Sequence, residues 1–187
     1  MTDVIRILQR EHASIATLVR SLEWQLAEFE RGENPDYDVI KGIINYFLTF
    51  PDIYHHPKED IIFAQLKLAD PASAALVGDL RRDHEQLSVR TREFADGITA
   101  VLREAQVPRE SLLRWGRNFI ELQRQHMDME ETVFFPTAKK ALKAEDWQAI
   151  DEELNKSDDP LVDDSVKEHF DALCQQILAW QEEHERG

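Results

Sequence analysis

Apolar residues recur every three or four positions over long stretches of the chain, which is the spacing of a helix with one buried face. One such face runs from Ile5 to Phe29, a second from Leu80 to Val101 and a third from Leu112 to Val133. A less regular stretch from Ile44 to Leu66 keeps one apolar face as well. The pattern therefore predicts four long helices.

Turn signals separate these stretches and define the expected fold. Pro51 and Pro57 fall inside the second stretch and must kink its helix. Asp70 before Pro71 indicates a helix N-cap followed by proline at the first helical position. Short turns between long helices predict an all-α, up-down-up-down four-helix bundle with an additional C-terminal helix.

We expect one domain over residues 1–187, with a bundle core at about 3–144 and a helical extension at 145–187. The extension should contain a short helix near Glu145 to Leu154 and a longer one near Val166 to Glu185.

Composition narrows the possible partners. The formal net charge is −15, which argues against nucleic acid and against anionic membranes, because both require a basic surface. The single cysteine, Cys174, excludes an internal disulfide and a cysteine-based zinc site. The start of the chain has no signal-peptide core, and no run of about 18 apolar residues exists. A cytoplasmic location is expected.

Two nine-residue segments repeat one arrangement. They are HHPKEDIIF at 55–63 and HMDMEETVF at 126–134, at an offset of 71 residues. Each has a histidine first, a glutamate four residues later, a second acid directly after it and a phenylalanine in ninth place. His12 and His84 repeat at an offset of 72, within Arg-Glu-His and Arg-Asp-His. The chain therefore uses one type of helical hairpin twice.

Four histidines and two glutamates interrupt the apolar faces of the four predicted helices. They are His12, His55, Glu59, His84, His126 and Glu130. A buried ionised carboxylate costs several kcal/mol unless it is paired or binds a metal, and no lysine or arginine shares these faces near the site. At about 1.5 Å per residue from the expected turns, all six residues lie at a similar depth. They suit a pair of divalent first-row ions, iron above all.

The H-x-x-x-E spacing places an imidazole and a carboxylate one turn apart on one helix face. The glutamates would bridge the two ions, a shared oxide or hydroxide could complete the core, and a position could stay open on each ion. No glutamate lies three residues before any histidine, which disfavours the E-x-x-H plan of ferritin-like diiron proteins. A single zinc ion would use about three ligands and leave the repeat unexplained.

The order H…H-x-x-x-E…H…H-x-x-x-E on a four-helix bundle resembles the hemerythrin-like, HHE cation-binding family. The resemblance covers roughly residues 5 to 143 and extends to HHPKED at 55–60 and to Glu-Glu followed by Phe-Phe-Pro at 130–136. It implies two iron ions with both glutamates bridging. The ligands that it implies are His12, His55, Glu59, His84, His126 and Glu130.

The sequence departs from oxygen-carrying hemerythrins at two places. Those proteins have a second histidine one turn after the histidine of the third helix, where this chain has Ser88. Their last carboxylate is an aspartate five residues after its histidine, whereas Glu130 follows His126 by four. The pattern is more similar to the diiron domain of iron-sulfur-cluster repair proteins, whose N-terminal cysteine-bearing domain has no counterpart in these 187 residues.

Two further features stay open at the level of sequence. Aligning the two nine-residue segments on their phenylalanines selects His55 and Glu59, which leaves His56 as a fifth nitrogen ligand or as a group that supports the ligands. Glu11 and Asp83 precede their histidines and should point about 100° away, so solvated salt bridges are expected for both.

Three functions fit these residues. The favoured one is a diiron protein that binds, senses or reacts with a small oxidant, namely oxygen, nitric oxide or peroxide. The second is a diiron enzyme of nitric oxide or peroxide detoxification or of iron-sulfur-cluster repair. The third is an interaction bundle that binds zinc or no metal. The sequence separates neither binding from turnover nor one oligomeric state from another.

Overall fold

The computed structural model describes residues 3–103, 105–157, 170 and 172–180. No strand occurs among these residues, so the predicted all-helical class is confirmed. The elements are α1 (Asp3–Arg31), α2 (Tyr37–Phe47), η1 (Pro51–His55), α3 (His56–Ala69), α4 (Pro71–Val77), α5 (Leu80–Leu102), α6 (Arg109–Met129), η2 (Glu130–Phe134), α7 (Phe135–Ala141) and α8 (Ala144–Ser157).

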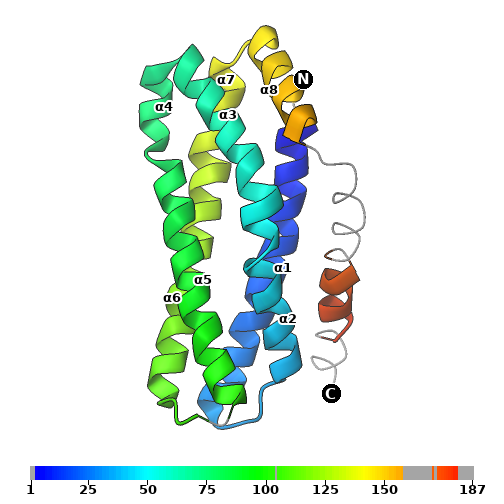
Figure 1. Ribbon diagram of the computed structural model, residues 1–187, viewed down its shortest axis with the longest axis vertical. Coiled ribbons are helices and arrows are strands. Elements are labelled where there is room, and N and C mark those ends of the chain that lie inside the picture. The colour runs from blue at the N-terminus through cyan, green and yellow to red at the C-terminus, as the bar shows by residue number, and fades with distance from the viewer. Residues whose placement is uncertain (1–2, 104, 158–169, 171, 181–187) are drawn as a thin grey trace.

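The long helices lie side by side along one axis of the molecule (Figure 1). α1 packs against α6, α6 against α5, and α5 against both α2 and α3. The chain passes along α1, returns through α2 and α3, crosses over at α4, and then repeats this course through α5 and α6. Among the described residues, no helix is both long and apolar enough to cross a membrane.

Local sequence explains where several helices begin and end. The side chain of Asp36 accepts hydrogen bonds from two amides of the first turn of α2, and Asp70 caps α4 as predicted. Gly32 follows α1 with φ of +84°, and Gly78 follows α4 with φ of +90°. Such positive φ angles favour glycine at the end of a helix.

The second predicted helix is divided at its prolines. α2 ends at Phe47, and η1 is a π turn in which the amide of His56 donates to the carbonyl of Pro51. Pro57 follows directly. Because proline has no N–H and its ring crowds the carbonyl four residues earlier, a widened turn before it relieves the clash.

A second π turn has the same relation to a proline. In η2 the amide of Phe135 donates to the carbonyl of Glu130, and Pro136 comes next. π turns of this kind are frequent at functional sites. η1 contains His55 and η2 contains Glu130, both predicted from the sequence as metal ligands.

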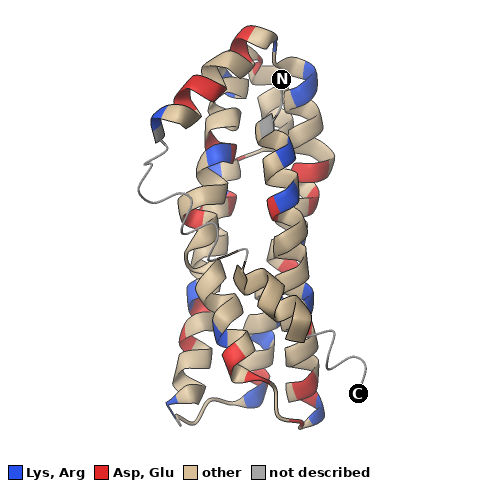
Figure 2. Cartoon of the chain, turned by 90° about the vertical axis from the view of Figure 1, so that its right-hand side faces the viewer, with Lys and Arg blue, Asp and Glu red and all other residues tan. Residues whose placement is uncertain are grey.

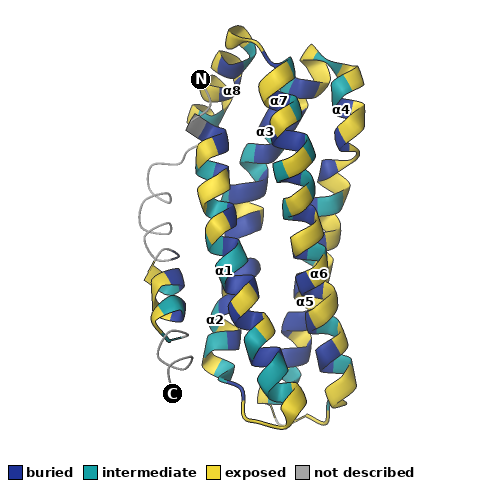
Figure 3. Cartoon of the chain, turned by 180° about the vertical axis from the view of Figure 1, so that it is seen from behind, coloured by how far each residue is buried: buried dark blue, intermediate teal, exposed yellow. Residues whose placement is uncertain are grey.

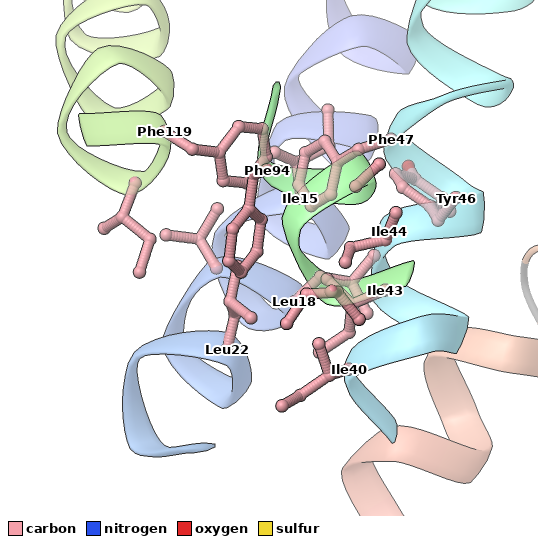
Figure 4. Close-up of a cluster of buried hydrophobic side chains, with 14 of the residues drawn as sticks. Ile15, Leu18, Leu22, Ile40, Ile43, Ile44, Tyr46, Phe47, Phe94 and Phe119 are labelled. Atoms are coloured by element: carbon pink, nitrogen blue, oxygen red, sulfur yellow. The ribbon is translucent and has the colours of Figure 1, made fainter. Parts of the chain in front are cut away.

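Buried and exposed positions alternate along each long helix (Figure 3). The buried apolar side chains form two separate clusters. The lower cluster fills the half of the bundle around α2 (Figure 4) and includes Ile15, Leu22, Ile43, Phe94 and Phe119. The upper cluster, in the half around α7 and α8, includes Leu8, Ile62, Leu80, Phe134 and Trp147. The histidines and glutamates of the repeat fall between these clusters on every long helix, and we call this level of the bundle the polar layer.

The C-terminal segment packs on the lower cluster. Residues 172–180 are helical, and the ring of Phe170 lies 5.2 Å from that of Tyr46 and 5.3 Å from that of Phe50. Cys174 is buried there. The predicted helix at 166–185 is therefore helical where it is described, and its positions 166–169, 171 and 181–185 lie outside the described residues.

Acidic and basic positions are interspersed along the helices in the view of Figure 2. Ion pairs on the surface link neighbouring helices, such as Arg124 of α6 with Glu23 of α1 at 2.6 Å. Exposed pairs of this kind contribute about 1 kcal/mol or less, so packing of the two clusters accounts for more of the stability than these pairs do.

Candidate metal centre

All six ligands expected from the sequence lie together in the polar layer. Glu59 and Glu130 have no exposed surface, and the histidines are also buried. They come from α1, from η1 and α3, from α5, and from α6 and η2, because each of these four helical segments places one polar turn at this level. His56, which the sequence left undecided, lies in the same layer and is buried as well.

The side chains form two overlapping groups that could each hold a metal ion. Within each group, the atoms that could bind an ion all lie within 4.8 Å of one another. The first group, which we call the two-histidine group, consists of His12, His55, Glu59 and Glu130. The second, which we call the three-histidine group, consists of His56, Glu59, His84 and His126.

Glu59 lies between the two groups. Its Oε1 is 3.3 Å from Nε2 of His55, and its Oε2 is 3.4 Å from Nε2 of His84. One oxygen therefore faces the two-histidine group and the other faces the three-histidine group, as in a carboxylate that bridges two ions.

Glu130 has the same arrangement from the opposite hairpin. Its Oε2 is 3.3 Å from Nε2 of His12, and its Oε1 is 3.2 Å from Nε2 of His126. The repeat seen in the sequence thus corresponds to two carboxylates that span the same pair of positions.

Acids outside the layer orient the rings of the two-histidine group. Nδ1 of His12 lies 2.8 Å from Glu131, and Nδ1 of His55 lies 2.8 Å from Glu11. Lys58 donates to the other oxygen of Glu11 at 2.7 Å. Since a carboxylate only accepts, each of these Nδ1 atoms carries the proton and each Nε2 faces the layer.

The expectation for Glu11 was wrong in part. Its salt bridge, to Lys58, is largely buried rather than solvated, because the Glu11 side chain is only 10% exposed and also reaches His55. The helix rotation that turns Glu11 away from His12 aims it at α3, which packs alongside. Glu131 was missed as a partner of His12, although its place as the second acid of the repeated segment was a signal.

The three-histidine group has a different set of outer partners. Asp60 lies 3.3 Å from Nδ1 of His84. Asp60 therefore supports a histidine of the other hairpin, although its spacing in the sequence pairs it with His56. Among the described residues, neither nitrogen of His126 has a hydrogen-bond partner.

The two rings of the two-histidine group require a positive charge between their Nε2 atoms. Nε2 of His12 and Nε2 of His55 are 3.1 Å apart. Because both rings carry their proton on Nδ1, two lone pairs would face each other at this distance in the neutral state. A proton or a metal cation between them removes the repulsion.

Buried polar atoms without partners give an independent test of fit. Among the described residues, both oxygens of Glu59 and of Glu130, and Nε2 of His84 and of His126, make no hydrogen bond. A buried polar group without a partner costs about 1–3 kcal/mol, and a charged one costs more. Carboxylate oxygen and imidazole nitrogen are ligands for iron, so the unpartnered atoms fit a pair of such ions.

The carboxylates also shift the pKa values of the histidines. Burial alone would lower the pKa of His12, but Glu130 and Glu59 outweigh burial and raise it to about 10. Neighbouring carboxylates likewise overcome burial at His84 and raise its pKa to about 11. At His126 burial dominates and lowers the pKa to about 4. The layer therefore attracts positive charge even before a metal is considered.

Residues 3–138 match the family model described as the hemerythrin HHE cation binding domain. The matched range contains all six expected ligands and His56. No curated protein and no solved structure matches the chain.

Proposed function

The chain belongs to the hemerythrin HHE cation binding domain family, and from this premise we propose that it holds two iron ions and binds, senses or reacts with a small oxidant. His12 and His55 would bind one ion, and His84 and His126 the other. Glu59 and Glu130 would bridge them. The proposal includes an up-down-up-down order for the four-helix bundle, which brings one polar turn from each long helix to the same level.

The observation that carries this proposal is that each of the two carboxylates reaches both histidine groups. Each of Glu59 and Glu130 is fully buried and directs one oxygen to each histidine group. A single ion in either group would leave two carboxylate oxygens facing unpaired imidazoles. With two ions, each of the four carboxylate oxygens of Glu59 and Glu130 faces a cation.

When bound, iron supplies redox chemistry toward oxygen, nitric oxide or peroxide. The protein restricts what can approach, because the apolar clusters above and below the layer exclude bulk water. A cleft of about 270 Å³ between α2 and α5, lined by residues such as Lys41, Leu48 and Thr99, includes none of the layer's side chains. This cleft is therefore separate from the side chains of the polar layer.

Metal analysis of the carboxylate variants tests this proposal. We expect two irons per chain in the wild type, and loss of at least one iron in Glu59→Ala and in Glu130→Ala with helicity retained. Glu85→Ala is the matched control, because Glu85 is an exposed glutamate on α5. Wild-type iron content in both layer variants would refute the bridging assignment.

Spectra distinguish binding from turnover. In air, the iron-loaded protein should show a visible absorption band that shifts when azide is added. A reversible change with nitric oxide or peroxide, without consumption over many cycles, would support a binding or sensing protein. Sustained consumption would support an enzyme, and a spectrum that responds to none of these molecules would contradict both.

A further inference from the structure

His55 and His56 are adjacent in the chain, yet both rings point into the polar layer. Successive residues of an α-helix point about 100° apart, so two neighbours rarely serve one compact site. Here each ring joins a different group: His55 joins the two-histidine group, and His56 joins His84 and His126.

The π turn η1 explains this placement. It ends at His55, and its wider turn rotates consecutive side chains by less than an α-helical turn does. Pro57 makes the wide turn favourable, because the amide that a regular helix would need at this position is missing. The sequence His-His-Pro therefore brings a second imidazole to the layer.

The other hairpin provides an internal comparison. At the offset of 71 residues, the counterpart of His56 is Met127. No π turn precedes it, since α6 runs unbroken from Arg109 to Met129. Met127 packs against the lower cluster, so the second hairpin contributes one imidazole where the first contributes two.

Contacts on both sides fix the ring of His56. Its Nδ1 lies 3.3 Å from one oxygen of Asp52, and the other oxygen of Asp52 accepts a hydrogen bond from Ser88 at 2.9 Å. The ring stacks on His84, with centroids 3.9 Å apart and planes 11° apart. With the proton held on Nδ1 by the carboxylate, Nε2 presents its lone pair to the three-histidine group.

We propose that His56 is a fifth nitrogen ligand, held in place by Asp52 and Ser88, so that one ion has three imidazoles and the other has two. The inference rests on the proposed diiron function. It adds that the two ions have different numbers of imidazole ligands. Ser88 lies on α5 and acts through Asp52 on an imidazole supplied by α3.

Titration of the metal-free protein with Fe²⁺ under anaerobic conditions tests the inference. His56→Asn keeps an N–H near the position of Nδ1, and so retains the contact with Asp52, but removes Nε2. We expect one ion to bind as in the wild type and the affinity of the other to fall by at least about tenfold. Met127→Leu is the matched control at the equivalent position and should bind both ions like the wild type.

Variants of Ser88 and Asp52, which hold His56 in place, provide a second test. This test does not depend on whether a variant of a polar-layer residue folds. Ser88 is partly exposed on α5, so Ser88→Ala should fold normally, and Asp52→Asn should weaken the same ion more than Ser88→Ala does. Binding of both ions by His56→Asn with wild-type affinity and spectrum would overturn the role of His56 and leave the diiron proposal intact. A wild-type protein that binds fewer than two ions would overturn both.

Discussion

At the scale of single residues, the acids that precede His12 and His84 differ between the two hairpins by one methylene group. Glu11 reaches Nδ1 of His55 at 2.8 Å. Its counterpart in the second hairpin is Asp83, whose side chain is shorter by one methylene. His126, the counterpart of His55, has no hydrogen-bond partner among the described residues. The hairpin with the shorter acid is thus the one whose histidine at this position lacks such a partner among the described residues.

Lengthening this acid should therefore strengthen the site. Asp83→Glu is expected to place a carboxylate at Nδ1 of His126 and to raise the affinity for the ion of the three-histidine group by about tenfold. Competition with a chelator of known affinity measures the change. Asp96→Glu, an exposed substitution on the same helix, should have no effect. An unchanged affinity in Asp83→Glu would show that the outer acid does not orient His126.

The raised pKa values of His12 and His84 predict how metal binding depends on pH. Both groups, at about 10 and about 11, stabilise the metal-free fold fully below their unfolded pKa of about 6.5. That contribution is lost as the pH rises through the folded values. Only neutral imidazole binds a metal, so the ions must displace these protons. The affinity for Fe²⁺ should therefore increase with pH until the pH reaches these folded pKa values, about 10 for His12 and about 11 for His84.

Calorimetry of Fe²⁺ binding at pH 7, in two buffers with different ionisation enthalpies, measures the protons exchanged. We expect release of protons to the buffer. Uptake of protons, or none exchanged, would mean that His12 and His84 are already neutral in the metal-free protein.

At the scale of secondary-structure elements, the two π turns connect proline to the site. In each turn, the residue after the last position of the turn donates the π-type hydrogen bond, and a proline follows that residue. The two prolines are Pro57 and Pro136. The helical period could be predicted from the sequence because apolar residues mark it directly. The π turns could not, since a proline inside a helix can be accommodated by a kink, a break or a widened turn, and tertiary packing selects among them.

Replacement of the first of these prolines should separate helix stability from metal binding. Pro57→Ala restores an amide that can donate to the carbonyl of Ile53 in a regular helix. We expect helicity to be retained or to increase, while the affinity for the ion of the three-histidine group falls by about tenfold as His56 rotates. Circular dichroism and Fe²⁺ titration measure the two effects. Pro71→Ala, at the ordinary first turn of α4, is the control, and equal metal loss in both variants would contradict this role of η1.

At the scale of the whole molecule, the polar layer divides the apolar core into two clusters. Phe170 belongs to the lower cluster and contacts Tyr46 and Phe50. Phe170→Ala should lower the free energy of unfolding by about 3 kcal/mol, as expected for a buried phenylalanine. Iron content should not change, because the lower cluster is separate from the ligands.

Urea unfolding and metal analysis of the same samples test this separation. Gln175→Ala, an exposed change on the same segment, should alter the free energy of unfolding by less than about 0.5 kcal/mol. Loss of iron from folded Phe170→Ala would show that the C-terminal segment helps to hold the site.

The level of the site could be predicted from the sequence, but its outer contacts could not. His12, Glu59 and Glu130 were identifiable because polar residues on an apolar face are costly unless they are paired. The partners Glu131 of His12 and Glu11 of His55 depend on which helices pack side by side and at what rotation. Hydrophobic periodicity records which face of a helix is buried, but not which neighbour covers its edge.

Two of the supporting acids cross between the hairpins. Asp60 of the first hairpin contacts His84 of the second, and Glu131 of the second contacts His12 of the first. Neither half of the chain therefore contains a complete site, although each contains the same parts. A peptide of either hairpin alone would lack an outer acid that one of its own histidines contacts in the full chain, Glu131 for His12 and Asp60 for His84.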